Sequence, residues 1–394
     1  MSDPIVIVSA ARTPMGGFLG CLKDASASEL GAAAISAAVT RAGIDPADVD
    51  ETVFGCVLPA GQGQAPARQA ALAAGLPLSS GSTTINKMCG SGMKAAMIAH
   101  DLLIADSATI AVAGGMESMS RAPYLMEKAR DGFRMGHGRV IDHMFLDGLE
   151  DAYDKGRLMG AFAEDCAEEY QFTRDTQDQF ALTSLARAQE AIGSGAFENE
   201  VTPVTIKGRK GETIVTTDEQ PGNARPDKIP TLRPAFREGG TVTAANSSSI
   251  SDGAAALVMM RASEAEKRGL TPLAIVRGHT NHADKPNLFP TAPIGAMRKL
   301  ETKTGWALKD VDLFEINEAF AVVTLAAMRD LDLPHDKVNV HGGACALGHP
   351  IGASGARVMV TLLAAMARHD VDRGMASLCI GGGEATAIAL ERVR

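Results

Sequence analysis

Apolar and polar positions follow two alternating patterns along the chain. Short apolar runs typical of buried strands are separated by stretches in which apolar residues recur three and four positions apart, as in helices. The predicted strands include 5–10, 109–113, 273–276 and 376–380, and the predicted helices include 28–42 and 354–367. This alternation predicts an α/β fold with helix-covered mixed sheets.

The two ends of the chain resemble each other, which indicates an internal repeat. Matching segments are 48–55 and 310–315, 90–95 and 353–357, and 113–117 and 380–384. The three pairs occur in the same order, at offsets of 262, 263 and 267 residues. We therefore expect one α/β unit to be used twice.

The middle of the chain breaks this pattern and is predicted to be an insertion. It contains a Gly/His/Asp-rich stretch at 131–148, a helical stretch at 164–192 and a polar segment at 207–237. The expected division is an N-terminal α/β half of 1–121 with 247–271, an inserted loop domain of 122–246 that covers the halves, and a C-terminal α/β half of 272–394.

Composition excludes several classes of protein. The chain has 394 residues, a net charge of −9 and no long basic run, so neither nucleic acid nor membrane is an expected partner. No apolar stretch approaches a membrane span, and the first five residues lack the pattern of a secretory signal. The six cysteines form no CxxC pair and do not resemble a secreted disulfide framework, so the cytoplasm is the expected location.

Cys89 is the first candidate for chemistry. It lies in Asn86-Lys87-Met88-Cys89-Gly90-Ser91-Gly92, directly before a predicted helix. The unpaired amides and positive end of the helix are expected to stabilise a thiolate. The glycines would let a bulky substrate approach the backbone. The alternative interpretation is a buried cysteine in a tight turn.

The other candidates lie in the C-terminal part. His349 is on a Gly/Pro-rich turn before a helix, from which its imidazole can project into a cleft. His341, Cys345 and His349 have a metal-like spacing, but the flanking glycines and proline argue against one continuous helix, and no metal is expected. Cys379 ends a strand at a glycine turn whose amides could hold an oxyanion. Asn317 is either a helix cap or a fixed amide donor.

Taken together, these segments resemble the thiolase family, in particular its short-chain acetyl-CoA acetyltransferases, over essentially the whole chain. The motifs that carry the resemblance are Ser9-Ala10-Ala11-Arg12-Thr13-Pro14, the Cys89 segment, Gly114-Gly115-Met116-Glu117-Ser118-Met119-Ser120, Asn317-Glu318-Ala319-Phe320-Ala321, Gly348-His349-Pro350-Ile351-Gly352 and Cys379-Ile380-Gly381-Gly382-Gly383. The resemblance implies a layered αβαβα fold, a homotetramer assembled through the segment 121–148, and coenzyme A thioesters as substrates without a further cofactor.

The resemblance also implies a role for each matching residue. Cys89 would carry the acyl group, with His349 as its base, and Cys379 would move a proton at the substrate α-carbon. The amides of Cys89 and Gly381 would form one oxyanion hole, and Asn317 would hold a water in the other. Substrate contacts would come from Met159, Phe236, Ala244 and Ser248. Lys207, Arg209, Lys210, Arg225 and Lys228 would either attract the phosphates of CoA or form a solvated face.

The expected activity is the reversible condensation of two acetyl-CoA to acetoacetyl-CoA and CoA, with a 3-ketoacyl-CoA thiolase of broader chain length as the alternative. Leu158 and Phe289 depart from the residues usual in the pocket of biosynthetic thiolases, which bears on chain length. A decarboxylating ketoacyl synthase does not need a thiol at Cys379. An inactive acyl-CoA-binding relative is disfavoured because no reactive residue is lost, and a nucleotide oxidoreductase because its glycine fingerprint is missing.

Overall fold

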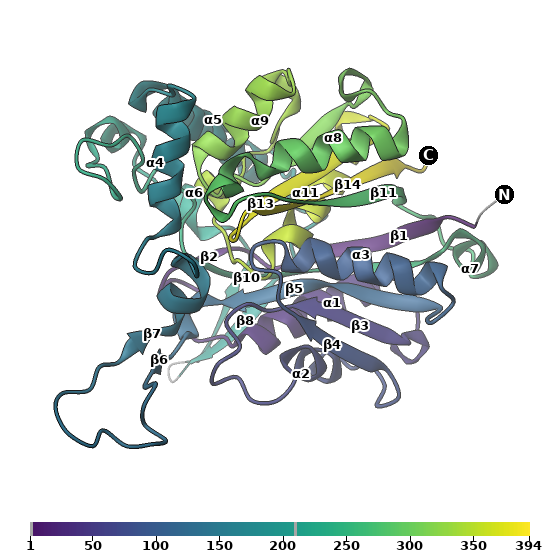
Figure 1. The fold of residues 1–394 in the computed structure, drawn as a ribbon. Coiled ribbons are helices and arrows are strands. Elements are labelled where there is room, and N and C mark those ends of the chain that lie inside the picture. Colours follow the sequence, from purple (N-terminus) through teal and green to yellow (C-terminus); the bar gives the residue numbers. More distant parts are fainter. Residues whose placement is uncertain (1–2, 209–210) are drawn as a thin grey trace.

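The computed structural model describes residues 3–208 and 211–394, and its centre is one ten-stranded mixed sheet (Figure 1). Nine strands follow one another in the order β4-β3-β5-β10-β1-β11-β14-β13-β12, and β2 (Gly16–Gly17) pairs with β10. Their bounds are β1 Ile5–Arg12, β3 Glu51–Gly55, β4 Gly81–Ile85, β5 Ile110–Ser118, β10 Ser251–Arg261, β11 Ala274–Ala283, β12 Leu313–Ile316, β13 Arg373–Ile380 and β14 Glu384–Arg392.

The strand order confirms the duplication. Starting from the central pair, β1-β10-β5-β3 is repeated as β11-β14-β13-β12, and only two residue pairs join β1 to β11. In each half an aspartate fixes the same strand start. The carboxylate of Asp50 accepts from the amides of Thr109 and Ile110, and that of Asp312 accepts from those of Asp372 and Arg373.

One of the three predicted sequence matches is wrong in register. Gly115 pairs with Gly55 inside the sheet, at the position that Leu378 occupies in β13, whereas Gly381 and Gly382 lie beyond the strand end. The offset of 267 residues therefore aligned the glycine pair Gly114-Gly115, which lies within β5, with the pair Gly381-Gly382, which lies in the turn after β13. Short glycine repeats can match by composition, while hydrogen-bonded strands fix the register.

Five layers result, as expected. The outer helices on the N-terminal half are α1 (Ala27–Ala42) and α2 (Pro66–Ala73), those on the C-terminal half are α8 (Ala292–Thr304) and α9 (Ala321–Asp330), and α3 (Ser91–Ile104) and α11 (Ser354–His369) lie between the halves (Figure 1). Successive residues of β1 face opposite layers, since Val6 packs with α1 and Ile7 packs with α3 and α11. Both faces of the sheet are therefore buried.

The two central helices touch through equivalent glycines. A Cβ added to Gly92 would lie 2.6 Å from the amide nitrogen of Ala356, and one added to Gly355 would lie 2.3 Å from that of Met93. No larger side chain fits at this crossing. Gly90 similarly makes room for Ile380, 2.3 Å from its added Cβ. The sequence suggested that the glycines after Cys89 leave room for a bulky substrate. In the structure Gly90 and Gly92 instead leave room for residues of the opposite half of the protein.

Between β5 and β10, the described residues add no strand to the large sheet. They form α4 (Met159–Glu169), α5 (Arg174–Gly193), α6 (Glu219–Asn223) and the hairpins β6 (Tyr124–Leu125) with β7 (Ile141–Asp142) and β8 (Val204–Gly208) with β9 (Gly211–Val215). The single helical stretch predicted at 164–192 is two helices, because Gln171 has φ 54° and Thr173 caps α5. The remaining short helices include α7 (Ala262–Lys267) and α10 (Ala344–Leu347).

This inserted segment packs mainly on the C-terminal half. Phe162 of α4 shares a core with Val322 of α9, and Leu185 of α5 packs with Leu347. The chain between β6 and β7 extends away from the body as a long loop (Figure 1). Among the described residues, no helix combines the length and apolar character needed to cross a bilayer.

Candidate active site

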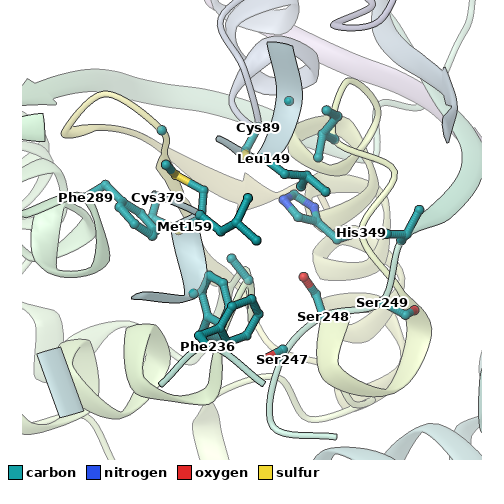
Figure 2. Close-up of a pocket in the computed structure, with 18 of the residues that line it drawn as sticks. Cys89, Leu149, Met159, Phe236, Ser247, Ser248, Ser249, Phe289, His349 and Cys379 are labelled. Atoms are coloured by element: carbon teal, nitrogen blue, oxygen red, sulfur yellow. The ribbon is translucent and has the colours of Figure 1, made fainter. Parts of the chain in front are cut away.

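A cavity of about 360 Å³ lies where both halves meet the inserted segment, and Figure 2 shows its side chains. It is lined by almost all of the predicted site residues, namely Cys89, Met159, Phe236, Ala244, Ser248, His349, Cys379 and Gly381. The two sulfur atoms come from opposite halves of the duplicated fold, and His349 faces the same space (Figure 2). The remaining walls are mostly apolar.

Cys89 is presented by a tight turn ahead of α3. Met88 adopts φ 46°, an uncommon conformation for a residue with a side chain. The carboxamide oxygen of Asn86 accepts from the Met88 amide at 2.9 Å. The Ser91 hydroxyl accepts from the Lys87 amide at 2.8 Å and donates to the Met88 carbonyl at 2.6 Å. These side-chain bonds hold the turn and fix the position of the cysteine.

Burial, and not the helix terminus, dominates the ionisation of Cys89. Burial raises the pKa of its thiol to about 11, although a hydrogen bond from the backbone of Gly381 lowers it, and the charge of Glu117 raises it further. The resting group is therefore a thiol. The end of the helix was expected to stabilise a thiolate, but the effect of burial on the pKa of this thiol is the larger one.

His349 presents one ring nitrogen to the cavity. Its Nδ1 lies 2.5 Å from the Ser354 hydroxyl, which also donates to the Pro350 carbonyl at 3.0 Å. Since a hydroxyl carries one proton, the Ser354 oxygen can accept from Nδ1–H. Nε2 is buried and has no hydrogen-bond partner among the described residues. Nε2 is then the free base of the site.

Burial, and secondarily the charge of Arg357, lowers the pKa of His349 to about 3. We therefore expect the rate of Cys89 acylation to change by less than about twofold between about pH 7.5 and pH 5.5. A histidine of ordinary pKa would lose about tenfold over that window, as its neutral form is protonated. With the lowered pKa, the loss appears only as the pH falls towards that lower value. Single-turnover acetylation at stepped pH measures this, and an acid limb near pH 6.5 would contradict it.

Cys379 ends β13 and is buried. Burial raises the pKa of its thiol, and a thiolate at Cys89 would raise it further, so Cys379 too rests protonated. The following turn needs glycine, because Gly382 and Gly383 have φ 93° and 85°. The turn is joined to the Cys89 loop by an ion pair between Lys87 and Glu384. This contact holds the loops of the two cysteines together.

Asn317 stands behind His349 and is not among the described residues that line the cavity. Its Nδ2 lies 3.5 Å from Nδ1 of His349, and Arg357 donates to its Oδ1 at 3.5 Å. It does not cap a helix, since α9 begins at Ala321 with Phe320 at the cap position. Its predicted role of holding a water stays a prediction.

Glu117 is a buried residue whose role the sequence did not reveal. Its carboxylate accepts from the amides of Val57, Leu58 and Gly352 at 2.9, 3.1 and 2.9 Å. Burial raises the pKa of Glu117 to about 7, although these hydrogen bonds lower it. It therefore ties the end of β5 to the turn that carries His349.

Other predicted residues lie elsewhere. His341 packs against Phe197 and His369, away from the cavity. Lys207, Arg225 and Lys228 do not line the cavity, and Arg209 and Lys210 lie outside the described residues. Leu158 and Phe289, which depart from the family pattern, both line it. Phe320 and Ile351, which belong to two of the quoted motifs, also line the cavity, and no sequence pattern pointed to the further apolar lining residues Phe145, Leu149 and Ile250.

Fold and site together define the class of protein, a duplicated α/β enzyme with a cysteine–histidine–cysteine site. The sequence matches the family model "Thiolase, N-terminal domain" over residues 5–263 and "Thiolase, C-terminal domain" over residues 270–392. The chain belongs to the thiolase family.

Curated relatives and solved structures match this chain over nearly its full length. The chain is 49% identical to an acetyl-CoA acetyltransferase of Cupriavidus necator, with 100% of both chains covered. It is 50% identical to acetyl-CoA acetyltransferase 2 of Arabidopsis thaliana, covering 98% of this chain and 96% of the relative. The crystal structure of the Bacillus anthracis acetyl-CoA acetyltransferase superposes with a TM-score of 0.97 at 41% identity, covering 100% and 99%. A thiolase of Ascaris suum in complex with coenzyme A gives 0.94 at 39%, covering 99% and 100%.

Proposed function

We propose that the protein is an acetyl-CoA C-acetyltransferase, which condenses two acetyl-CoA to acetoacetyl-CoA and CoA and also catalyses the reverse reaction. The observation that carries this proposal is the position of Cys89, His349 and Cys379 on one apolar cavity. The full-length similarity to proteins named acetyl-CoA acetyltransferase supports it.

In the first step Cys89 becomes acetylated. Nε2 of His349 takes the thiol proton, and the sulfur attacks the carbonyl carbon of acetyl-CoA. The amides of Cys89 and Gly381 are proposed to stabilise the oxyanion. CoA leaves as a thiolate and takes up the proton of Cys379, which burial has kept protonated. The products are acetyl-Cys89, protonated His349, ionised Cys379 and CoA.

In the second step the carbon–carbon bond forms. Ionised Cys379 removes an α-proton from a second acetyl-CoA, and the carbanion attacks the acetyl carbon on Cys89. The Cys89 sulfur leaves and recovers its proton from His349. Both thiols and the neutral imidazole are then restored, and no bound cofactor is required.

The pocket favours a short acyl group on Cys89. Cys89 packs against a buried cluster that includes Val57, Leu58, Met144 and Ile351. A longer chain would need these buried side chains to move, which close packing resists. The bulky Phe289 also narrows the cavity, and it is fixed by rings of Phe162 and Phe320.

Thiolytic cleavage over a series of 3-ketoacyl-CoA from C4 to C10 tests this preference. We expect kcat/KM to be highest at C4 and to fall by about tenfold or more beyond it, because one methylene in a pocket is worth about 1–3 kcal/mol of discrimination. A maximum at longer chains would favour the 3-ketoacyl-CoA thiolase, and absence of cleavage at every length would reject both.

We also propose a homotetramer assembled through the loop between β6 and β7. This loop extends from the body (Figure 1). It exposes Met135 and Met126, which are 87% and 51% exposed, and Tyr124 of the adjoining β6 is 67% exposed. Such exposure is typical of association surfaces. The molar mass in solution should correspond to four chains and fall in the variant Met126→Glu/Met135→Glu. An unchanged mass in that variant would reject this surface.

The cytoplasm is the proposed location. All six cysteines fall within the described residues and are free thiols, as expected in a reducing compartment.

A further inference from the structure

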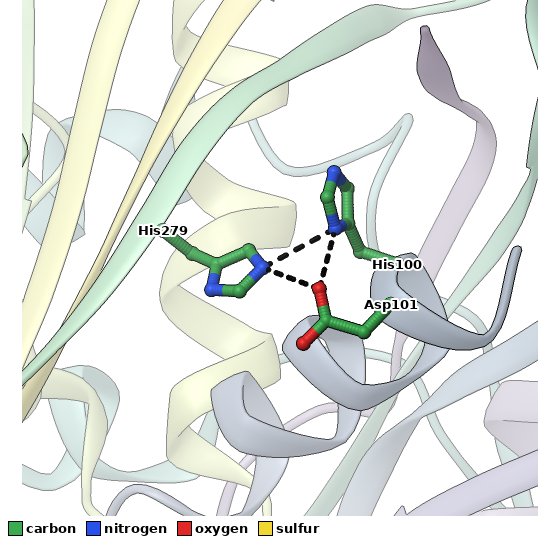
Figure 3. Close-up of side chains that lie close together, drawn as sticks. All are labelled: His100, Asp101 and His279. Carbon is green, nitrogen blue, oxygen red and sulfur yellow. Dashed lines mark hydrogen bonds and ion pairs between the residues drawn. The ribbon is translucent and has the colours of Figure 1, made fainter. Parts of the chain in front are cut away.

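Two imidazoles and a carboxylate converge at the seam between the two halves, outside the cavity (Figure 3). His100 and Asp101 lie near the C-terminal end of α3, and His279 lies on β11 of the opposite half. Asp101 Oδ1 is 3.0 Å from His100 Nδ1 and 3.1 Å from His279 Nε2, and the two nitrogens are 3.2 Å apart. His100 lies about 14 Å along the helix from the end that follows Cys89.

These separations match those of atoms bound to one metal ion. Atoms about 2.1 Å from a common ion lie about 3.0 Å from one another in octahedral and about 3.4 Å in tetrahedral coordination, and the three separations fall within this range. Hydrogen bonds alone explain these three short separations less well than a shared metal ion does. If both rings donate to Asp101, two N–H groups face each other at 3.2 Å, and if one ring donates to the other, that donor is lost to the carboxylate.

The surroundings suit a bound cation. The imidazole side chains are 17% and 10% exposed, so packing holds them in place, whereas that of Asp101 is 61% exposed and leaves a path for the ion and for water ligands. The negative end of α3 adds a favourable potential. One nearby charge opposes a bound cation, namely the ammonium of Lys303, which donates to the carbonyl of His279 at 2.9 Å.

We propose that His100, Asp101 and His279 bind a divalent transition-metal ion of the Zn²⁺ type, with water completing its coordination. Two imidazole nitrogens and one carboxylate oxygen suit such an ion better than Mg²⁺ or Ca²⁺, which prefer oxygen ligands. The bound ion ties the helix that follows Cys89 to a strand of the other half. It is therefore a structural link between the halves and takes no part in the acyl-transfer chemistry.

The test is metal binding by the intact, chelator-treated protein. Titration with Zn²⁺ should show one site per chain, and Co²⁺ at the same site should give a visible absorption spectrum of a nitrogen- and oxygen-ligated ion. His279→Gln and Asp101→Asn should each weaken binding by more than the roughly 10- to 100-fold that loss of an outer partner costs a metal site. The thermal midpoint should rise with Zn²⁺ in the wild type but not in His279→Gln.

Two controls separate this site from others. His137→Gln changes an exposed histidine outside the cluster and should bind as the wild type does. Cys89→Ser removes a thiol that could itself bind Zn²⁺ in the cavity, and it should retain the seam site. Equal binding by the wild type and His279→Gln, or no binding by the wild type, would overturn the proposal and leave a hydrogen-bonded cluster. The metal-free midpoint of His279→Gln shows whether that variant is folded.

Discussion

Replacing Cys89 with serine is expected to lower acetyl transfer by at least about a thousandfold. His349 rests as a neutral imidazole whose pKa burial lowers to about 3, so it is a weak base. It can help to ionise a thiol when substrate binds, but a serine hydroxyl is far less acidic. Sulfur is also the better leaving group in the second step. Protein-bound radiolabel after incubation with labelled acetyl-CoA measures the acyl-enzyme directly.

The matched control for this variant is Cys21→Ser. Cys21 is partly buried and lies outside the cavity, so its replacement should leave labelling unchanged. The wild-type level of label on Cys89→Ser would show that another group carries the acetyl. Loss of label in both variants would point to a structural effect, which the thermal midpoint would reveal.

Replacing Cys379 with alanine is expected to separate the two half-reactions. Acetylation of Cys89 should change little, because CoA can leave as a thiolate without taking a proton from Cys379. Condensation should fall by about 10²- to 10⁴-fold, the range that a positioned acid or base contributes. Alanine adds no new polar atom to this buried position. Single-turnover labelling and steady-state condensation, measured on the same preparation, give both rates.

The ratio of the condensation rate to the acetylation rate distinguishes a catalytic role of Cys379 from a structural one. A variant that has merely lost packing at β13 should lose both half-reactions together, whereas loss of the α-carbon base affects only the second. If Cys379→Ala condenses at the wild-type rate, the proposed role of Cys379 is wrong. A further check is exchange of the acetyl-CoA α-protons with deuterated water, which should disappear with Cys379.

The sequence predicted which reactive residue types form the site more completely than it predicted how they are arranged. Cys89, His349, Cys379 and Gly381 stand in short motifs whose residue types can be read directly, and all of them line the cavity. Much of the apolar wall was not predictable, because Phe145, Leu149 and Ile250 lie outside the motifs and share no sequence pattern. Asn317 shows the same limit, since its motif could not reveal that its amide contacts His349 instead of lining the cavity.

By itself, the sequence determined the alternation of strands and helices, the duplication and the candidates for the reactive side chains, since periodicity and motif spacing are local properties. Only the tertiary structure decided the register of the repeat, the partners of Gly90 and Gly92, and the protonation of Cys89. Contacts between the halves partly bury Cys89 and bring glycines against the opposite backbone. Burial and close approach depend on residues distant in the chain, so neighbouring residues cannot specify them.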